Sequence, residues 1–132
     1  MRISRTVEYG LTAAVFIAQN CEDGRVMAKK ISEAYDLPTE YLLQVMQQLV
    51  RVGILTSKKG PNGGFGLAKP ATEITLLEII EAIEGPVIVP MNLAEQTGKP
   101  FAKKIEKVFL DVSKAMKASL AKVTLAELAG KK

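Results

Sequence analysis

One segment, residues 36–68, sets the architecture that this sequence predicts: DLPTEYLLQVMQQLVRVGILTSKKGPNGGFGLA. Pro38 ends any preceding helix, because proline has no N–H to donate and restricts the residue before it. Thr39 then offers an N-cap for a helix that runs to about Val52 and stops at Gly53. Apolar residues recur on this helix at steps of three and four, which predicts a buried face. That face comprises Leu42, Val45, Met46 and Leu49.

The flanking residues complete a familiar arrangement. Residues 26–35 show the spacing of a short amphipathic helix, and residues 5–20 are apolar on nearly every side, as in a buried central helix. Two short helices joined by a tight turn form a helix-turn-helix. Residues 54–57 and 65–68 then predict two strands joined by a basic, glycine-rich turn. A hairpin in this place is the wing of a winged-helix domain.

The C-terminal part predicts a helix over 75–84, a loop over 86–100 without a convincing period, and a long helix from Phe101. That long helix carries a heptad-like apolar seam, which a small domain buries most simply against its symmetry mate. The predicted fold is therefore mainly α with a small β-hairpin. We divide it into a winged helix-turn-helix domain (1–85), a loop (86–100) and a dimerisation helix with a C-terminal tail (101–132). The predicted dimer interface comprises Phe101, Ile105, Val108, Phe109, Val112, Ala115 and Met116.

Composition excludes most chemistry. The chain has one cysteine and no histidine, so it cannot build an internal disulfide, a Ser-His-Asp triad or a His-ligated zinc site. We therefore expect no enzyme, no metal and no cofactor. Cys21 lies beside two acidic residues, which disfavour a thiolate and argue against redox sensing. No signal peptide or apolar run of about 20 residues is visible, which predicts a cytoplasmic protein without a membrane partner.

The net charge of +4 is unevenly distributed. Residues 1–70 carry nine basic and six acidic side chains, residues 71–98 carry five acidic ones, and residues 99–132 carry nine lysines and three acids. Two basic segments flanking an acidic one suggest a polyanion partner, although lysines that merely solvate a helix fit equally well.

The helix over 39–52 points to the polyanion being double-stranded DNA. Its outward face is rich in glutamine, which can pair bidentately with adenine in the major groove, although any solvent-facing helix is polar. Lysines in the wing and at the start of the preceding helix suit phosphate contacts, and glycines let backbone N–H groups approach phosphate. The predicted DNA contacts are Arg2, Arg5, Lys29, Lys30, Thr39, Glu40, Tyr41, Gln44, Gln47, Gln48, Arg51, Lys58, Lys59, Gly60, Gly63 and Gly64.

With these motifs placed, the sequence resembles the Rrf-two family of bacterial winged-helix transcriptional regulators over almost its whole length. The resemblance rests on RISRTVEYGL (2–11), LPTEYLLQ (37–44), GPNGGFGLA (60–68) and ITLLEIIEAIEG (74–85). It implies a homodimer, held largely by the long C-terminal helix, that binds a near-palindromic operator and represses transcription. Leu43 and Lys59 stand where other members have a glutamate and an arginine, so the resemblance does not supply the operator sequence.

The sequence differs from well-known members of this family in one loop. Family members such as the iron–sulfur cluster regulator hold a cluster on three cysteines in the loop after the Glu-Gly motif, where this chain has PVIVPMNLAEQTGKP (86–100). The resemblance therefore points to the cluster-free branch, whose cysteine-metabolism repressor is controlled by a partner protein. A regulatory partner protein or a small effector both fit this chain. The alternative function is a protein-interaction module, or an effector-gated regulator, with lost or conditional DNA binding.

Overall fold

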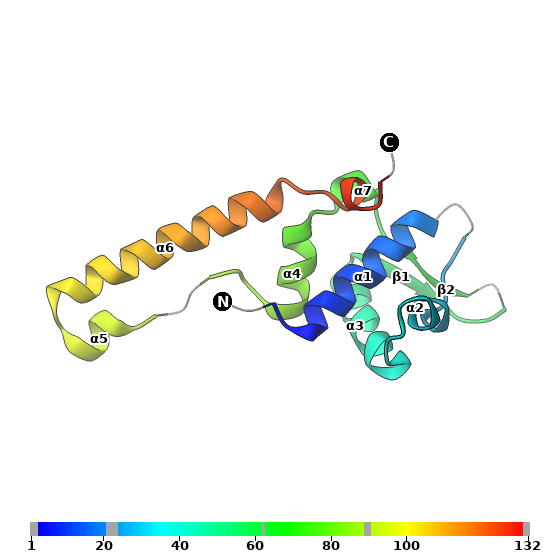
Figure 1. Ribbon diagram of the computed structural model, residues 1–132, viewed down its shortest axis with the longest axis horizontal. Helices are drawn as coiled ribbons and strands as arrows, with labels where there is room; N and C mark the ends of the chain where they lie inside the picture. The colour runs from blue at the N-terminus through cyan, green and yellow to red at the C-terminus, as the bar shows by residue number, and fades with distance from the viewer. Residues whose placement is uncertain (1–2, 21–23, 62, 89–90, 131–132) are drawn as a thin grey trace.

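The computed structural model describes residues 3–20, 24–61, 63–88 and 91–130. Figure 1 shows a helical body from which one long helix projects. The first helix, α1 (Arg5–Asn20), runs through that body and is contacted by both α3 (Thr39–Arg51) and α4 (Leu76–Glu84). Small residues allow this close packing, because a Cβ added to Gly10 would clash with Cδ1 of Ile83. The sequence expectation of a buried central helix over 5–20 is confirmed.

The helix-turn-helix consists of α2 (Ala28–Tyr35) and α3, and the core face expected for α3 is buried, with no residue more than 3% exposed. The expected N-cap is wrong. Thr39 is the first helical residue, Pro38 takes the cap position, and no side chain caps the helix. The Thr39 hydroxyl instead lies 2.6 Å from that of Ser32, which also donates to the Leu37 carbonyl oxygen. The hydroxyl of Thr39 thus stabilises the turn and not the helix end.

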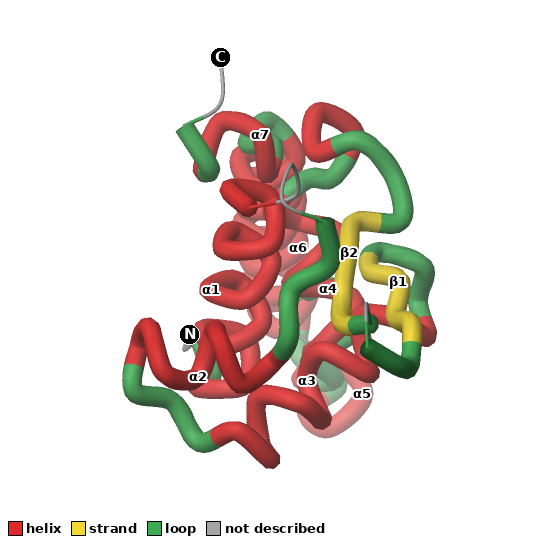
Figure 2. Tube along the Cα trace, turned by 90° about the vertical axis from the view of Figure 1, so that its right-hand side faces the viewer, coloured by secondary structure: helices red, strands yellow, loops and turns green. Residues whose placement is uncertain are grey.

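The wing follows α3 directly. Strand β1 (Leu55–Lys58) pairs antiparallel with β2 (Gly64–Leu67), and Lys58 lies opposite Gly64. Val26 adds a bridge on the outer side of β2, exchanging two backbone hydrogen bonds of 2.7 and 2.9 Å with Phe65. Figure 2 shows the hairpin at one edge of the helical body. The position of the wing is therefore fixed from both sides.

A short 3-10 turn, η2 (Ala71–Glu73), leads into α4, whose start is fixed by a capping box between Thr75 and Glu78. The expectation of an unstructured segment over 86–100 is wrong in part, because α5 (Leu93–Thr97) forms within it. The Glu106 carboxylate accepts the N–H of Ala94 at 2.5 Å, which ties this short helix to the next one. Five residues are too few to show a helical period in the sequence.

The long helix α6 (Pro100–Ala121) projects from the body, and the chain then returns as α7 (Leu125–Leu128), as Figure 1 shows. Leu125 is fully buried, and its N–H donates to the Ile74 carbonyl oxygen at 2.7 Å. The segment around α7, which we expected to be an appended tail, therefore belongs to the core of the winged-helix domain. None of the helices in the described part of the chain is long and apolar enough to cross a membrane.

Candidate nucleic-acid interface

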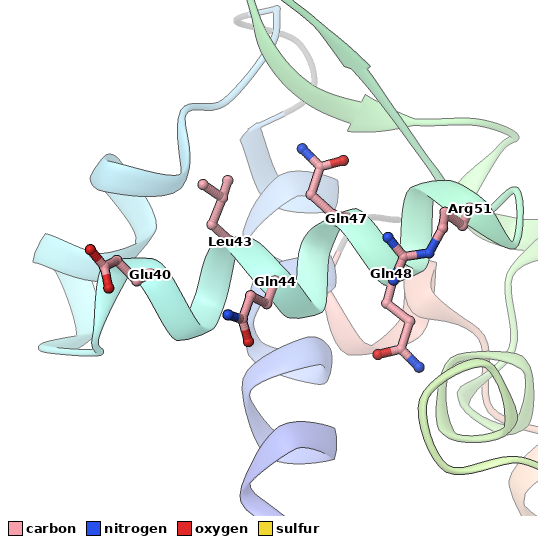
Figure 3. A pocket seen from close by; sticks show the side chains of 6 residues that line it. All are labelled: Glu40, Leu43, Gln44, Gln47, Gln48 and Arg51. Carbon is pink, nitrogen blue, oxygen red and sulfur yellow. The ribbon is translucent and has the colours of Figure 1, made fainter.

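Helix α3 presents a row of exposed polar side chains on the face opposite its core residues. Glu40, Gln44, Gln47 and Arg51 are all exposed, at the helical spacing expected from the sequence. Together with Leu43 and Gln48 they line a shallow hollow along the helix, which Figure 3 shows from close by. Amide groups both donate and accept hydrogen bonds, and guanidinium groups donate in a fork, so this row carries the chemistry that distinguishes base edges.

A second groove, of about 440 Å³, joins α3 to the wing. Lys29 contributes from α2, Gln47 from α3, and Lys58 and Lys59 from the hairpin, and the three lysines are exposed. No acidic side chain is among the residues that line this groove in the described part of the chain. The fold thus places three predicted phosphate-contacting lysines, which come from separate parts of the sequence, in the same groove as Gln47.

Five residues that line this groove are not among the predicted DNA contacts. They are Met27, Ala28, Leu43, Ser57 and Phe65. Leu43 lies three residues after Glu40 and four before Gln47, so the helical period alone could have placed it on the outward face. Alternation of side chains along β1 could not have found Ser57, because it places Ser57 on the same side of the strand as Leu55, which is buried.

Gln48, which was predicted to contact DNA, is instead hydrogen-bonded to α4. Its side-chain nitrogen donates to the carbonyl oxygens of Ala82 and Ile83, at 3.1 and 3.2 Å, in the last turn of α4. The side chain is half-buried, whereas that of Gln47 is exposed. Because the amide N–H groups of Gln48 are already engaged, we leave this residue out of the proposed DNA contacts.

The wing glycines also divide into two groups. Gly60 is exposed at the turn, as expected for a phosphate contact, whereas Gly63 and Gly64 are buried. The N–H of Gly63 donates to the Gly60 carbonyl oxygen at 2.9 Å, and a Cβ on Gly64 would lie 2.8 Å from the Val26 carbonyl oxygen. Gly63 and Gly64 therefore allow the turn to pack closely, and we leave them out of the proposed DNA contacts.

The remaining expected contacts lie around this surface. Tyr41 packs edge-on against Tyr9 with ring centroids 5.3 Å apart, and its hydroxyl bonds to that of Thr6, so it faces α1.

Lys30 is exposed beside Lys29 in a separate shallow hollow on α2. Arg5, the first residue of α1, is exposed but lines neither groove on α3. The expectations for Arg2 and Cys21 lie outside the described residues.

The residues expected at a dimer interface lie along α6. Phe101 and Val108 are more than half exposed, Ile105 and Phe109 are over a third exposed, and Ala115 is also exposed. Val112 and Met116 are half-buried. Among the described residues of this helix, only Ala102 and Ser113 are fully buried. One face of α6 thus presents large apolar side chains that the described part of the chain leaves uncovered.

A family model named Rrf2 and described as an iron-dependent transcriptional regulator matches residues 3–131. This chain belongs to the Rrf2 family. A relative from Haemophilus influenzae that is named as an HTH-type transcriptional regulator is 30% identical over 133 residues, covering 100% of this chain and 89% of the relative. A relative from Aquifex aeolicus with the same kind of name is 41% identical over 81 residues, covering 61% of this chain and 56% of the relative. The chain thus matches little more than half the length of that second relative.

Solved Rrf2 structures share the whole fold. The structure of CymR, the global cysteine regulator of B. subtilis, matches with a TM-score of 0.85 and 29% identity, covering 98% of this chain and 97% of CymR. IscR of T. potens matches with a TM-score of 0.76 and 27% identity, covering 97% of this chain and 85% of IscR. This Rrf2 chain is therefore a DNA-binding transcriptional regulator with a helix-turn-helix fold, and not an enzyme.

The donor atoms of this chain do not fit a cysteine-held iron–sulfur cluster. Such clusters are held by several thiolates, and this Rrf2 sequence has a single cysteine and no histidine. Residues 86–100 contain neither residue type. Within the described residues, no group of three His, Cys, Asp or Glu side chains is placed to hold a metal ion. The description of the family as iron-dependent therefore does not extend to the ligands present here.

Proposed function

We propose that this Rrf2 chain binds a near-palindromic DNA operator as a homodimer and represses transcription without an iron–sulfur cluster. The observation that carries the proposal is the groove in which Lys29, Gln47, Lys58 and Lys59 meet. Such a surface suits a duplex, because α3 supplies side chains for base edges while lysines of α2 and the wing supply charge for the phosphates on either side.

The exposed apolar face of α6 supports the proposed homodimer. A C2 dimer carries two copies of α3, and its symmetry makes the preferred DNA site an inverted repeat. Bound across a promoter, such a dimer excludes the polymerase, so we propose repression. Control by a partner protein or a small effector is part of the proposal, whereas global cysteine regulation is said of CymR and is not carried over to this chain.

The test begins with selection of genomic fragments by the purified, metal-free protein. Bound fragments are sequenced, and the enriched site is titrated against random DNA at two salt concentrations. We expect one inverted repeat, bound about 10³-fold or more above random DNA, and loss of transcription in vitro from a promoter that contains it. Weak, steeply salt-dependent binding without an enriched site would contradict the proposal and favour a protein-interaction module.

Two variants separate base contacts from phosphate contacts in the same titration. Gln44→Ala should weaken operator binding roughly 5- to 150-fold per half-site and leave random DNA nearly unchanged. Lys59→Ala should weaken both DNAs and reduce the salt slope by about 1 per protomer. Lys114→Ala, an exposed lysine on α6, serves as the control for lost charge away from the groove. Equal losses by Gln44→Ala on both DNAs would contradict its assignment to bases.

A further inference from the structure

Leu43 is an apolar residue in the middle of the proposed DNA-contacting face. Its side chain is 39% exposed, whereas its neighbour Leu42 is fully buried. Glu40 and Gln47, three residues before and four after it, lie on the same side of α3. Single exposed leucines are common on protein surfaces and do not by themselves indicate a binding site. Leu43 is of interest because it lies among the proposed DNA-contacting residues.

Two separate hollows meet at this side chain. Leu43 lines both the hollow along α3 and the groove that contains Lys58 and Lys59. Figure 3 shows it projecting from the same side of the helix as Gln47. It is not among the residues packed against the buried core cluster. A duplex that occupies the groove would therefore meet Leu43 together with Gln47.

We propose that Leu43 contacts the C5-methyl group of a thymine and makes the operator depend on that base in each half-site. Thymine is the one standard base whose major-groove edge carries an apolar group. Against the polar edges of the other bases, a leucine would displace water without replacing its hydrogen bonds. The inference rests on the proposed function, because it requires α3 to lie in the major groove.

The spacing on α3 also places the thymine. Leu43 and Gln47 are four residues apart, which is about 6 Å along a helix axis, and successive base pairs are about 3.4 Å apart. The thymine should therefore lie within about two base pairs of the base that Gln47 contacts. Because glutamine suits adenine, we expect the two residues to select a short A·T-containing step together.

Deoxyuridine provides the test, because it differs from thymidine only by the missing methyl group. In the operator found by selection, each thymine and its symmetry mate are replaced in turn by deoxyuridine, and binding of the full chain is titrated. For the wild type we expect one position where affinity falls roughly fourfold per half-site, as for the loss of one buried methyl group. For Leu43→Ala we expect weaker binding to the thymine operator and no further loss at that position.

Controls separate this contact from indirect effects of uracil on DNA shape. Gln44→Ala should weaken the operator but keep the wild-type cost of deoxyuridine, and the melting temperature of Leu43→Ala should be unchanged because Leu43 lies outside the core cluster. Equal costs for the wild type and Leu43→Ala at every thymine would overturn the inference. So would an operator that tolerates deoxyuridine everywhere, although the proposed function would then stand. A protein that enriches no operator would overturn both.

Discussion

Two glycines of the wing have similar backbones and different surroundings. Gly60 and Gly64 have φ angles of +104° and +122°, in the region that side chains disfavour. A Cβ on Gly64 would lie 2.8 Å from the Val26 carbonyl oxygen, whereas nothing lies within 4 Å at Gly60. We expect Gly60→Ala to lower the free energy of unfolding by roughly 1 kcal/mol from backbone strain alone. Gly64→Ala should lower it by roughly 3 kcal/mol, because the backbone at Val26 must also move. Equilibrium unfolding in urea measures both, and equal losses would show that the contact with Val26 is unimportant.

The sequence could place side chains around α3 but could not say what each one touches. The helical period correctly separated the buried Leu42 from the exposed Gln44. It could not separate Gln47 from Gln48, because each lies three or four residues from both Gln44 and Arg51, and the partner of Gln48 is 34 residues away in the chain. The same limit applies to Gly64, where a hairpin glycine was predictable and its packing against Val26 was not. The sequence thus shows which chemical group a residue carries, whereas the partner that this group contacts depends on tertiary packing.

Gln48 joins α3 to the end of α4. The last carbonyls of a helix have no partner within it, and the Gln48 amide supplies N–H groups to those of Ala82 and Ile83. Gln48→Ala should therefore lower the free energy of unfolding by about 1–2 kcal/mol. Gln48→Glu should cost more than Gln48→Ala, because a carboxylate would face two carbonyl oxygens at the negative end of the α4 dipole.

Gln47→Glu is the matched control for this prediction. It introduces the same charge one residue earlier, on an exposed side chain, and should change the free energy of unfolding by less than about 0.5 kcal/mol. Urea unfolding of the four proteins, including the wild type, makes the comparison. If Gln48→Glu and Gln47→Glu had the same stability, the bonds from Gln48 to α4 would contribute nothing.

Elements differed in how well the sequence predicted them, according to where their stability comes from. Helices α3 and α4 carry an apolar period over at least two turns, and α1 is apolar on nearly every side, so each was predictable from its own residues. The short helix α5 has too few residues for a period and depends on the Glu106 carboxylate at its start. The sequence indicated only a C-terminal tail where α7 forms, because the burial of Leu125 depends on contacts with residues some 50 positions earlier in the chain. Local signals predict elements, and non-local contacts decide where short ones pack.

At the scale of the whole molecule, α6 is the helix whose apolar face is not covered by other residues of the described chain. A helix of 22 residues is about 33 Å long, and this one projects from the body in Figure 1 with an uncovered apolar face. Only one end of it is held near the winged-helix core through α4, and the other end carries α5. Exposing Val108 and Phe101 to water is unfavourable, and pairing two copies of this face removes both from solvent.

Val108→Asp tests whether this face holds the dimer together. Val108 is 58% exposed within one chain, so the substitution should leave the protomer folded and place a charge in the interface. We expect the wild type to sediment as a dimer and the variant as a monomer at the same micromolar concentration. Operator affinity should fall at least 100-fold, because the second half-site no longer benefits from the effective concentration that linkage provides. Affinity for random DNA should fall much less.

The control is Lys114→Gln, which changes the net charge by the same amount as Val108→Asp. Six residues further along, Lys114 lies on another side of the helix at 3.6 residues per turn, and it is exposed. It should remain a dimer and keep its operator affinity. If Val108→Asp also remained dimeric with an unchanged melting temperature, the apolar face of α6 would not be the dimer contact. The inverted-repeat operator would then require a different arrangement of the two α3 helices, because their separation is set by whichever surface joins the protomers.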